Sequence, residues 1–77
     1  MPTARKRNIL LCREIYEIIN TCEIPIWITA DIFDLNPDNL SKLYNGEITP
    51  TIYQLIMFMD TVKKTLNNIH INDYLEK

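Results

Sequence analysis

The chain has 77 residues and a single glycine, Gly46. Tight turns depend on glycine for their left-handed positions, so one glycine in the whole chain disfavours a turn-rich fold. Hydrophobic residues make up 47% of the sequence, which is too many for a disordered chain. A chain of this length buries only about 60% of its unfolded surface, so it forms one small domain of modest stability. We therefore expect a single all-α domain.

The first helix is expected over residues 7–20, with Asn8 as its N-cap. Its apolar residues recur at helical spacing and form two neighbouring rows. The row expected to face the core consists of Leu11, Ile15, Ile18 and Cys22, and the row beside it consists of Cys12, Tyr16 and Ile19. A stripe this wide is typical of deep burial or, in a protein this small, of an interface.

Pro25 marks the next boundary, because the residue before a proline disfavours helical backbone. The pattern from residue 26 to residue 34 is again helical, with Ala30 and Phe33 facing inward. Residues 24–29 are dense in β-branched side chains, so they are the one place where a strand could form instead.

The pair Asn36-Pro37 predicts the start of a third helix, because it places a cap before a proline in the first turn. Leu40 and Leu43 lie three residues apart on this short helix, and Asn45-Gly46 ends it. Thr49-Pro50 repeats the starting pattern.

A fourth helix follows with a long apolar stripe. The stripe consists of Ile52, Leu55, Ile56, Met59, Val62 and Leu66. Met59 is expected in the core, and Met57 or Phe58 at a dimer seam. Asn67-Asn68 is expected to end this helix, and residues 73–76 to form a fifth. The sequence therefore predicts five helices.

The formal charge of −2 is unevenly distributed. Residues 1–7 form a basic arm that contains Arg5, Lys6 and Arg7, which leaves five basic against ten acidic residues in the domain at 8–77. The arm is either a DNA-phosphate clamp or a solvated tail.

Several classes of protein are excluded at this stage. No stretch of 18 apolar residues suggests a membrane span, and no cleavage site follows the apolar run at residues 9–12. Cys12 and Cys22 would lie about 15 Å apart on one helix, too far for a disulfide, so we expect free thiols in a reducing cytoplasm. His70 has no metal-ligand neighbours, and no nucleophile accompanies the paired carboxylates, so we expect no metal, cofactor, small-molecule ligand or enzyme activity.

Two helices joined by a tight turn, the second short and ended by Asn45-Gly46, match a helix-turn-helix unit. The second helix of this unit and the segment after it contain Leu40-Ser41-Lys42-Leu43-Tyr44-Asn45-Gly46, followed by Thr49-Pro50-Thr51 and Leu55. This stretch resembles part of the lambda-repressor/Cro-like (XRE-type) helix-turn-helix family. The resemblance extends from about residue 15 to residue 75 and implies a compact five-helix, lambda-repressor-like DNA-binding domain. It implies a small transcriptional regulator of phage or plasmid type that binds operator DNA as a homodimer, with half-sites about one helical turn apart.

Carried over residue by residue, the resemblance implies base-edge contacts from Asn36, Asp38, Ser41 and Lys42. It implies backbone contacts from Asn39 and Asn45, with Arg5, Lys6 and Arg7 assisting at the phosphates or in a groove.

The sequence departs from the family where polar, DNA-facing residues are usual. Ile26, Trp27 and Ile28 stand at the start of the second helix, Ile19 replaces a common arginine, and Asp34 replaces the usual turn glycine. The three apolar residues at 26–28 either pack inside the molecule or form an exposed patch. In the second case the chain is a helix-turn-helix protein that binds another protein, such as a repressor, through Ile19, Ile26 and Trp27. It would then act as a repressor antagonist or another phage-encoded modulator.

Overall fold

A computed structural model describes the backbone of residues 4–75 and the side chains of residues 4–67. Every regular element in this part of the chain is helical, which confirms the all-α class for the described residues. The elements are α1 (Ala4–Cys22), α2 (Ile26–Ile32), the short 3-10 helix η1 (Pro37–Asn39), α3 (Ser41–Tyr44) and α4 (Ile52–Leu75). Residues 26–29 belong to α2, so the alternative strand does not form there.

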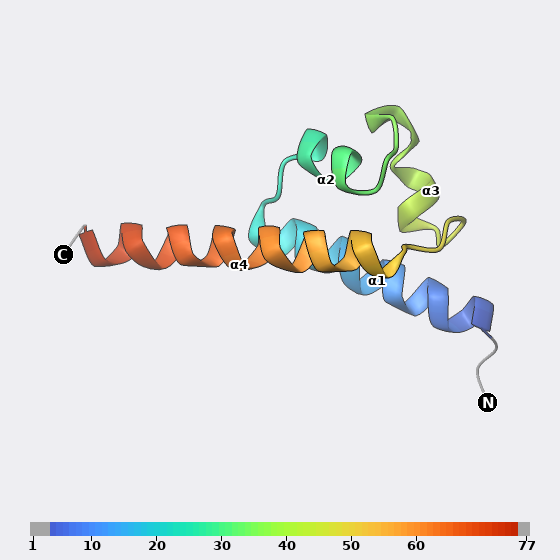
Figure 1. Cartoon of the computed structure of the whole chain (residues 1–77), viewed down its shortest axis with the longest axis horizontal. Coiled ribbons are helices and arrows are strands. Elements are labelled where there is room, and N and C mark those ends of the chain that lie inside the picture. Colours follow the sequence, from blue (N-terminus) through green and yellow to red (C-terminus); the bar gives the residue numbers. More distant parts are fainter. Residues whose placement is uncertain (1–3, 76–77) are drawn as a thin grey trace.

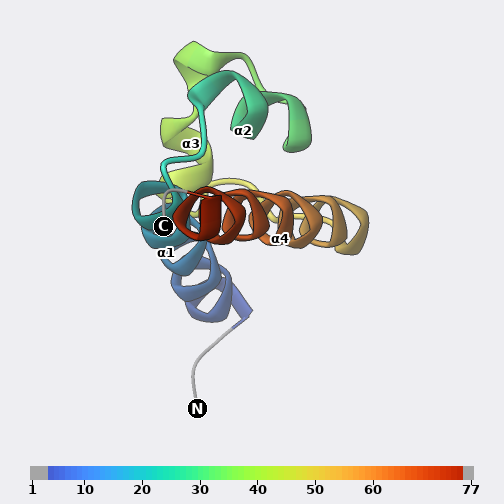
Figure 2. The same cartoon turned by 90° about the vertical axis from the view of Figure 1, so that its left-hand side faces the viewer.

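The two long helices, α1 and α4, lie against each other, and the three short elements sit on one side of them (Figure 1). In this group α3 packs against α1, and α2 packs against α4. The view at 90° shows α2, η1 and α3 above the crossing of the two long helices (Figure 2). The core therefore lies where all four α-helices meet.

Eight buried side chains form the centre of the core, with the Phe33 and Phe58 rings 5.7 Å apart. They are Cys12, Ile15, Ile19, Ile24, Ile32, Phe33, Leu43 and Phe58. Ala30 and Leu40 are also buried. The inward positions predicted for Ala30 and Phe33 are thus confirmed.

The buried face of α1 is rotated from the one that we predicted. Cys12 and Ile19, from the second row, are buried, whereas Ile18, from the row expected to face the core, is exposed. The reason is that α3 and the loop after it cover the second row: the Tyr16 and Tyr44 rings lie 4.5 Å apart, and the Cys12 thiol donates to the Ile48 carbonyl over 3.8 Å.

Helix α1 begins at Ala4, so Asn8 is not its N-cap and Arg5, Lys6 and Arg7 lie on the helix. The Asn8 side chain instead forms two hydrogen bonds to the loop after α3. Its amide nitrogen donates to the carbonyls of Gly46, over 3.1 Å, and Ile48, over 2.8 Å. These bonds tie the loop after α3 to α1.

Three helices end in the same way, with one residue in the left-handed region. These residues are Glu23 (φ 54°), Asp34 (φ 55°) and Gly46 (φ 75°). In each case the next amide donates to the carbonyl five residues earlier, as in a Schellman motif: Ile24 to Ile19, Leu35 to Ala30 and Glu47 to Lys42. Asp34, which replaces the usual turn glycine of the family that the sequence resembles, thus adopts the left-handed conformation itself.

Helix α4 differs from the prediction at both ends. It begins after Thr51, whose hydroxyl accepts from the Gln54 amide while the Gln54 side-chain oxygen accepts from the Thr51 amide. This capping box, and not Thr49-Pro50, starts the helix. The helix then continues past Asn67-Asn68 to Leu75, so the predicted break and the separate fifth helix are wrong.

The predicted buried stripe of α4 is also largely wrong. Among the described side chains of this helix Phe58 is the buried one, and of the stripe only Leu55 and Val62 pack against the core. The others are exposed: Ile52, Ile56, Met59 and Leu66. The core lies on the Phe58 side of α4, so the greater part of the stripe has no covering element among the described residues.

Candidate functional site

Two large apolar side chains stand side by side on the surface at the start of α2. Ile26 is 59% exposed and Trp27 is 70% exposed. Helix α2 turns Thr29, Ala30 and Ile32 toward the core. Its first two residues, Ile26 and Trp27, therefore face outward. We call Ile26 and Trp27 the α2 patch.

The neighbours of the α2 patch are held inside the molecule. Ile28 packs against the core, and the buried Thr29 hydroxyl donates to the Pro25 carbonyl over 3.2 Å. Ile19, predicted as a third member of the patch, is buried in the core and cannot present its side chain to a partner. Because α1 turns its second row inward, the patch contains two residues instead of three.

The surface that follows the α2 patch is acidic. Asp31 is exposed one helical turn after Trp27, so the two side chains share a face of α2. Over residues 26–42 three exposed carboxylates, from Asp31, Asp34 and Asp38, accompany one exposed cation, Lys42. The charge of this surface therefore opposes the approach of phosphate.

The six polar residues predicted to face DNA all lie on the surface, over η1, α3 and their flanks. They are Asn36, Asp38, Asn39, Ser41, Lys42 and Asn45. The Asn36 side-chain oxygen caps η1, because it accepts from the Asp38 amide over 3.0 Å. The segment that would enter a groove is thus one 3-10 turn followed by the four-residue α3, which is a short reading surface.

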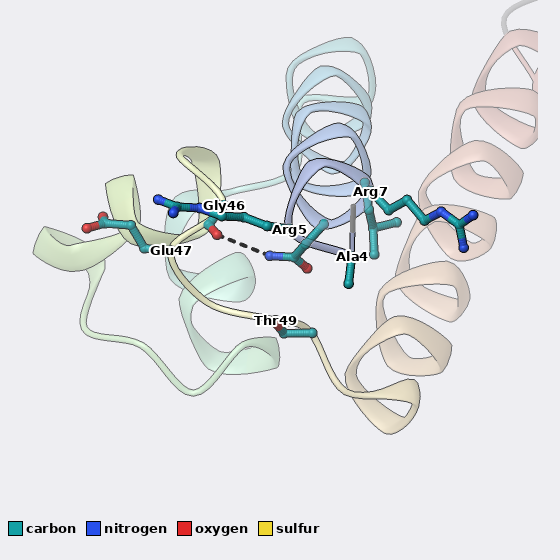
Figure 3. Close-up of a pocket in the computed structure, with 8 residues that line it drawn as sticks. Ala4, Arg5, Arg7, Gly46, Glu47 and Thr49 are labelled. Atoms are coloured by element: carbon teal, nitrogen blue, oxygen red, sulfur yellow. Dashed lines mark hydrogen bonds between the residues drawn. The ribbon is translucent and has the colours of Figure 1, made fainter. Parts of the chain in front are cut away.

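The basic residues of the predicted arm do not join this polar surface. In both views the beginning of α1 lies at the bottom and the segment that holds η1 lies at the top, with α3 between them (Figures 1 and 2). Arg5 and Arg7 instead line an open hollow of about 720 Å³, together with Gly46, Glu47 and Thr49. Figure 3 shows Arg5 extended toward Gly46 and Glu47, and Arg7 directed to the other side of α1.

A second concave surface was missed by the sequence reasoning. A groove of about 400 Å³ runs between α1 and α4, over a floor that includes Ile15, Phe58 and Val62. Glu14 stands on its α1 rim and Lys63 on its α4 rim. The apolar stripe on α4 was the sequence feature that could have indicated this groove. Its periodicity alone does not distinguish a stripe that other elements cover from one that is exposed to solvent.

The titratable groups with shifted pKa values are structural. Burial raises the pKa of the Cys12 thiol, and burial together with the nearby Tyr16 raises the pKa of the Tyr44 phenol. Cys12 and Cys22 are both free thiols. Among the described residues, no group of three histidine, cysteine or carboxylate side chains is placed to hold a metal ion.

No family model, curated protein or solved structure matches this chain. In the part of the chain that the structure describes, no helix has the length and apolar character of a membrane span.

Proposed function

We propose that this chain is a helix-turn-helix protein that binds another protein through the α2 patch. One observation carries the proposal: Ile26 and Trp27 are side by side and are mostly exposed on a helix whose other apolar residues are used in the core. A large apolar side chain that the fold leaves uncovered is typical of an interaction site, and tryptophan is enriched at the energetic centres of interfaces.

The size of Trp27 suits an anchor. Burying its exposed surface would contribute roughly 3 kcal/mol before the costs of association. Its indole N–H would also need a hydrogen-bond acceptor on the partner, which adds directional specificity.

The charges around the patch define the class of partner. Asp31 follows Trp27 on the same face, and Asp34 and Asp38 extend the acidic surface. A partner with a basic surface and an apolar pocket is complementary to this arrangement. A DNA-binding protein has such a surface, so an antagonist of a repressor, or another phage-encoded modulator, fits the proposal. The function is one of binding, with no catalytic step, and the two free thiols suit the cytoplasm.

A capture experiment with three variants tests the proposal. The wild-type chain, Trp27→Ala and the control Tyr53→Ala, which removes an equally exposed aromatic residue from α4, are immobilised and exposed to a cell lysate. We expect the wild type and Tyr53→Ala to retain the same basic protein and Trp27→Ala to lose it, with unchanged helical circular dichroism in all three. Equal retention by all three variants would refute the role of the α2 patch.

A second candidate, operator DNA binding by a homodimer, is favoured by the exposed polar surface of η1 and α3. Asn36, Ser41 and Lys42 are side chains that suit base edges. Fluorescence anisotropy with mixed-sequence duplex DNA at about 50 and 200 mM salt tests this candidate. A DNA-binding chain would bind at the lower salt concentration and lose affinity steeply at the higher one. The acidic surface leads us to expect no binding at either concentration.

A further inference from the structure

The groove between α1 and α4 has the size and the lining of a small-molecule site. Its volume of about 400 Å³ falls within the range of roughly 300–1,000 Å³ that is usual for ligand pockets. Apart from Glu14 and Lys63 on the rims, every described side chain that lines it is apolar. The α1 side includes Leu11, Ile15 and Ile18, and the α4 side includes Leu55, Met59 and Val62. Such a lining favours a ligand with a hydrocarbon body.

The groove is elongated along the two helices. Leu11 and Ile18 are seven residues apart on α1, and Leu55 and Val62 are seven residues apart on α4. Each side therefore extends over about 10 Å. An unbranched alkyl chain lies more easily in a trough of this form than a rounded ring system does. Met59, whose flexible thioether adapts to irregular surfaces, borders the trough on the α4 side.

The α1 side of the groove leads to a cation. Arg7, Leu11 and Ile15 follow one another at intervals of four residues, so they form one row on the same face of α1. Leu11 lines both the groove and the hollow that contains Arg7, so the two concave surfaces adjoin. Figure 3 shows Arg7 extended from α1 toward the side on which α4 lies. Among the described residues, no ion pair joins the Arg7 guanidinium.

The other charges beside the two concave surfaces offset one another. Glu14 and Lys63 stand on opposite rims of the groove and carry opposite charges. In the hollow, Arg5 extends toward Glu47 (Figure 3). Glu14 is two helical turns from Arg7, a distance of about 10 Å over which salt screens most of the repulsion of an anion. Arg7 is thus the uncompensated charge of the described residues at the end of the apolar row.

The depth of the groove favours a single chain over a larger occupant. Ile15 and Phe58 are buried, and Leu11, Leu55 and Val62 are half-buried, so the apolar lining is recessed from the surface. A flat membrane surface does not reach a recessed lining. An α-helix is about 10–12 Å wide with its side chains, so a 10 Å length of helix needs more volume than the groove holds.

We infer that the groove binds the chain of a free alkyl carboxylate, a medium-chain fatty acid, with the carboxylate beside Arg7. The guanidinium donates hydrogen bonds to both carboxylate oxygens, and the chain displaces water from the apolar lining. No such ligand was expected from the sequence, because the groove forms only when α1 packs on α4. The site contains no residue of the α2 patch, so the inference goes beyond the proposed function and does not depend on it.

A titration of the chain with octanoate, followed by two-dimensional amide NMR, tests the site. We expect saturable shifts at residues that line the groove and none at the α2 patch. Hexanoate, which is two methylene groups shorter, should bind at least about tenfold more weakly, because each buried methylene contributes about fourfold in affinity. Octanol has the same chain without the charge and should bind more weakly than octanoate.

Arginine variants test the place of the carboxylate. Arg7→Gln should weaken octanoate binding by about fivefold and leave octanol binding within about twofold, because only the carboxylate uses the guanidinium. Arg5→Gln is the matched control, since Arg5 is directed toward Glu47, and it should leave both affinities within about twofold. Octanoate and octanol affinities that are equal in the wild type, or an equal effect of the two variants on octanoate, would overturn the assignment of the carboxylate to Arg7.

Methionine variants test the place of the chain. Met59→Glu sets a charge beside the chain and should weaken octanoate binding at least about tenfold. Met57→Glu, a change at an exposed methionine of the same helix outside the groove, should leave the affinity within about twofold. Circular dichroism checks that each variant keeps its helical content. Equal weakening by these two variants would overturn the placement of the chain in the groove.

Two further measurements on the wild type identify other occupants of the groove. One is cosedimentation with phosphatidylglycerol vesicles, and the other is the mass in sedimentation equilibrium. We expect no cosedimentation and a mass of 9.1 kDa. Absence of octanoate shifts would overturn the inference. Vesicle binding in that case would assign the groove to a membrane surface, and a higher mass would assign it to a second copy of the chain.

Discussion

Single residues in the left-handed region mark where α1, α2 and α3 end. Glu23, Asp34 and Gly46 have nearly the same backbone angle, yet one of the three is glycine. A side chain at this angle brings its Cβ close to the following carbonyl, which costs roughly 1–2 kcal/mol. Aspartate tolerates the conformation better than glutamate does. The chain thus holds some unfavourable backbone energy at its two acidic helix ends.

This comparison predicts a stabilising substitution. Glu23→Gly should raise the free energy of unfolding by about 0.5–1 kcal/mol, because relief of the left-handed angle exceeds the entropy that glycine adds to the unfolded chain. Asp34→Gly should give a smaller gain. Urea unfolding followed by circular dichroism measures both. A loss of stability in Glu23→Gly would show that its side chain makes a contact that outweighs the angle.

Gly46 is the opposite case. A Cβ at this position would lie 2.8 Å from Ile9 Cγ1 and 3.0 Å from Ile9 Cα, and the residue has a φ of 75°. Gly46→Ala should therefore lower the free energy of unfolding by at least about 2 kcal/mol, through both the angle and the clash. Asn45→Ala, a change at the exposed neighbouring residue, should cost less than about 0.5 kcal/mol. Equal effects of the two variants would contradict the close approach of α1 to this loop.

The buried Cys12 thiol gives the protein a pH dependence on the alkaline side. Burial raises the pKa of this thiol in the folded state, so the folded chain holds the proton more tightly than the unfolded chain does. Stability is therefore fully present below about pH 9 and falls as the pH rises above it. Urea midpoints between about pH 8 and 10 should fall for the wild type and fall less for Cys12→Ala. An equal decrease of the urea midpoint in the wild type and in Cys12→Ala would assign the pH dependence to another group. Tyr44, whose phenol pKa is also raised, is one such group.

At the scale of the element, the start of α4 depends on a reciprocal pair of hydrogen bonds. Thr51→Ala removes the hydroxyl that accepts from the Gln54 amide, and it should cost about 1 kcal/mol of stability. Thr51→Ser keeps the hydroxyl and should be close to neutral. Thr49→Ala, two residues earlier, should also be close to neutral, because the helix does not begin there. Thermal unfolding distinguishes the three variants, and a larger cost at Thr49 than at Thr51 would contradict this helix start.

The elements that the sequence predicted well are those with strong local signals. Pro25, Asn36-Pro37 and Asn45-Gly46 fixed the boundaries of the short helices, because proline and left-handed positions restrict the backbone locally. Asn67-Asn68 is a weaker signal, since asparagine lowers helix propensity without forbidding helix, and α4 continues through it. The start of α1 was missed because Arg5, Lys6 and Arg7 were interpreted as an arm, although arginine and lysine are good helix formers.

The covered side of each long helix could not be predicted. Periodicity identifies an apolar stripe, but the elements that pack on the stripe decide which part becomes buried. For α1, which packs against α3 and α4, Cys12 and Ile19 are buried and Ile18 is exposed. For α4, the core contacts Phe58 and leaves Met59 in water. The same holds for the candidate site. The sequence pattern identified Ile26 and Trp27, but it did not reveal the burial of Ile19, because tertiary packing determines that burial.

At the scale of the whole molecule, the basic side chains of the first turns of α1 are separated from the acidic side chains of α2 and η1. The first turns of α1, which carry Arg5, Lys6 and Arg7, lie below the crossing of the two long helices (Figures 1 and 2). The elements α2 and η1, which carry Asp31 and Asp38, lie above it. A protein that grips DNA through the η1 segment would need its cations beside that segment. This chain has Lys42 there, with three exposed carboxylates from Asp31, Asp34 and Asp38. It also has an exposed tryptophan one element earlier. That distribution is the reason for proposing a protein partner.

The central claim is that Trp27 is an uncovered anchor that a partner buries, and its fluorescence tests this claim directly. Trp27 is the single tryptophan of the chain, so its emission reports on the α2 patch alone. In the free protein we expect emission and acrylamide quenching close to those of the urea-unfolded chain. In the complex with the protein retained in the capture experiment, we expect a blue shift and protection from quenching. A blue-shifted, protected tryptophan in the free protein, or unchanged emission in the complex, would contradict the account.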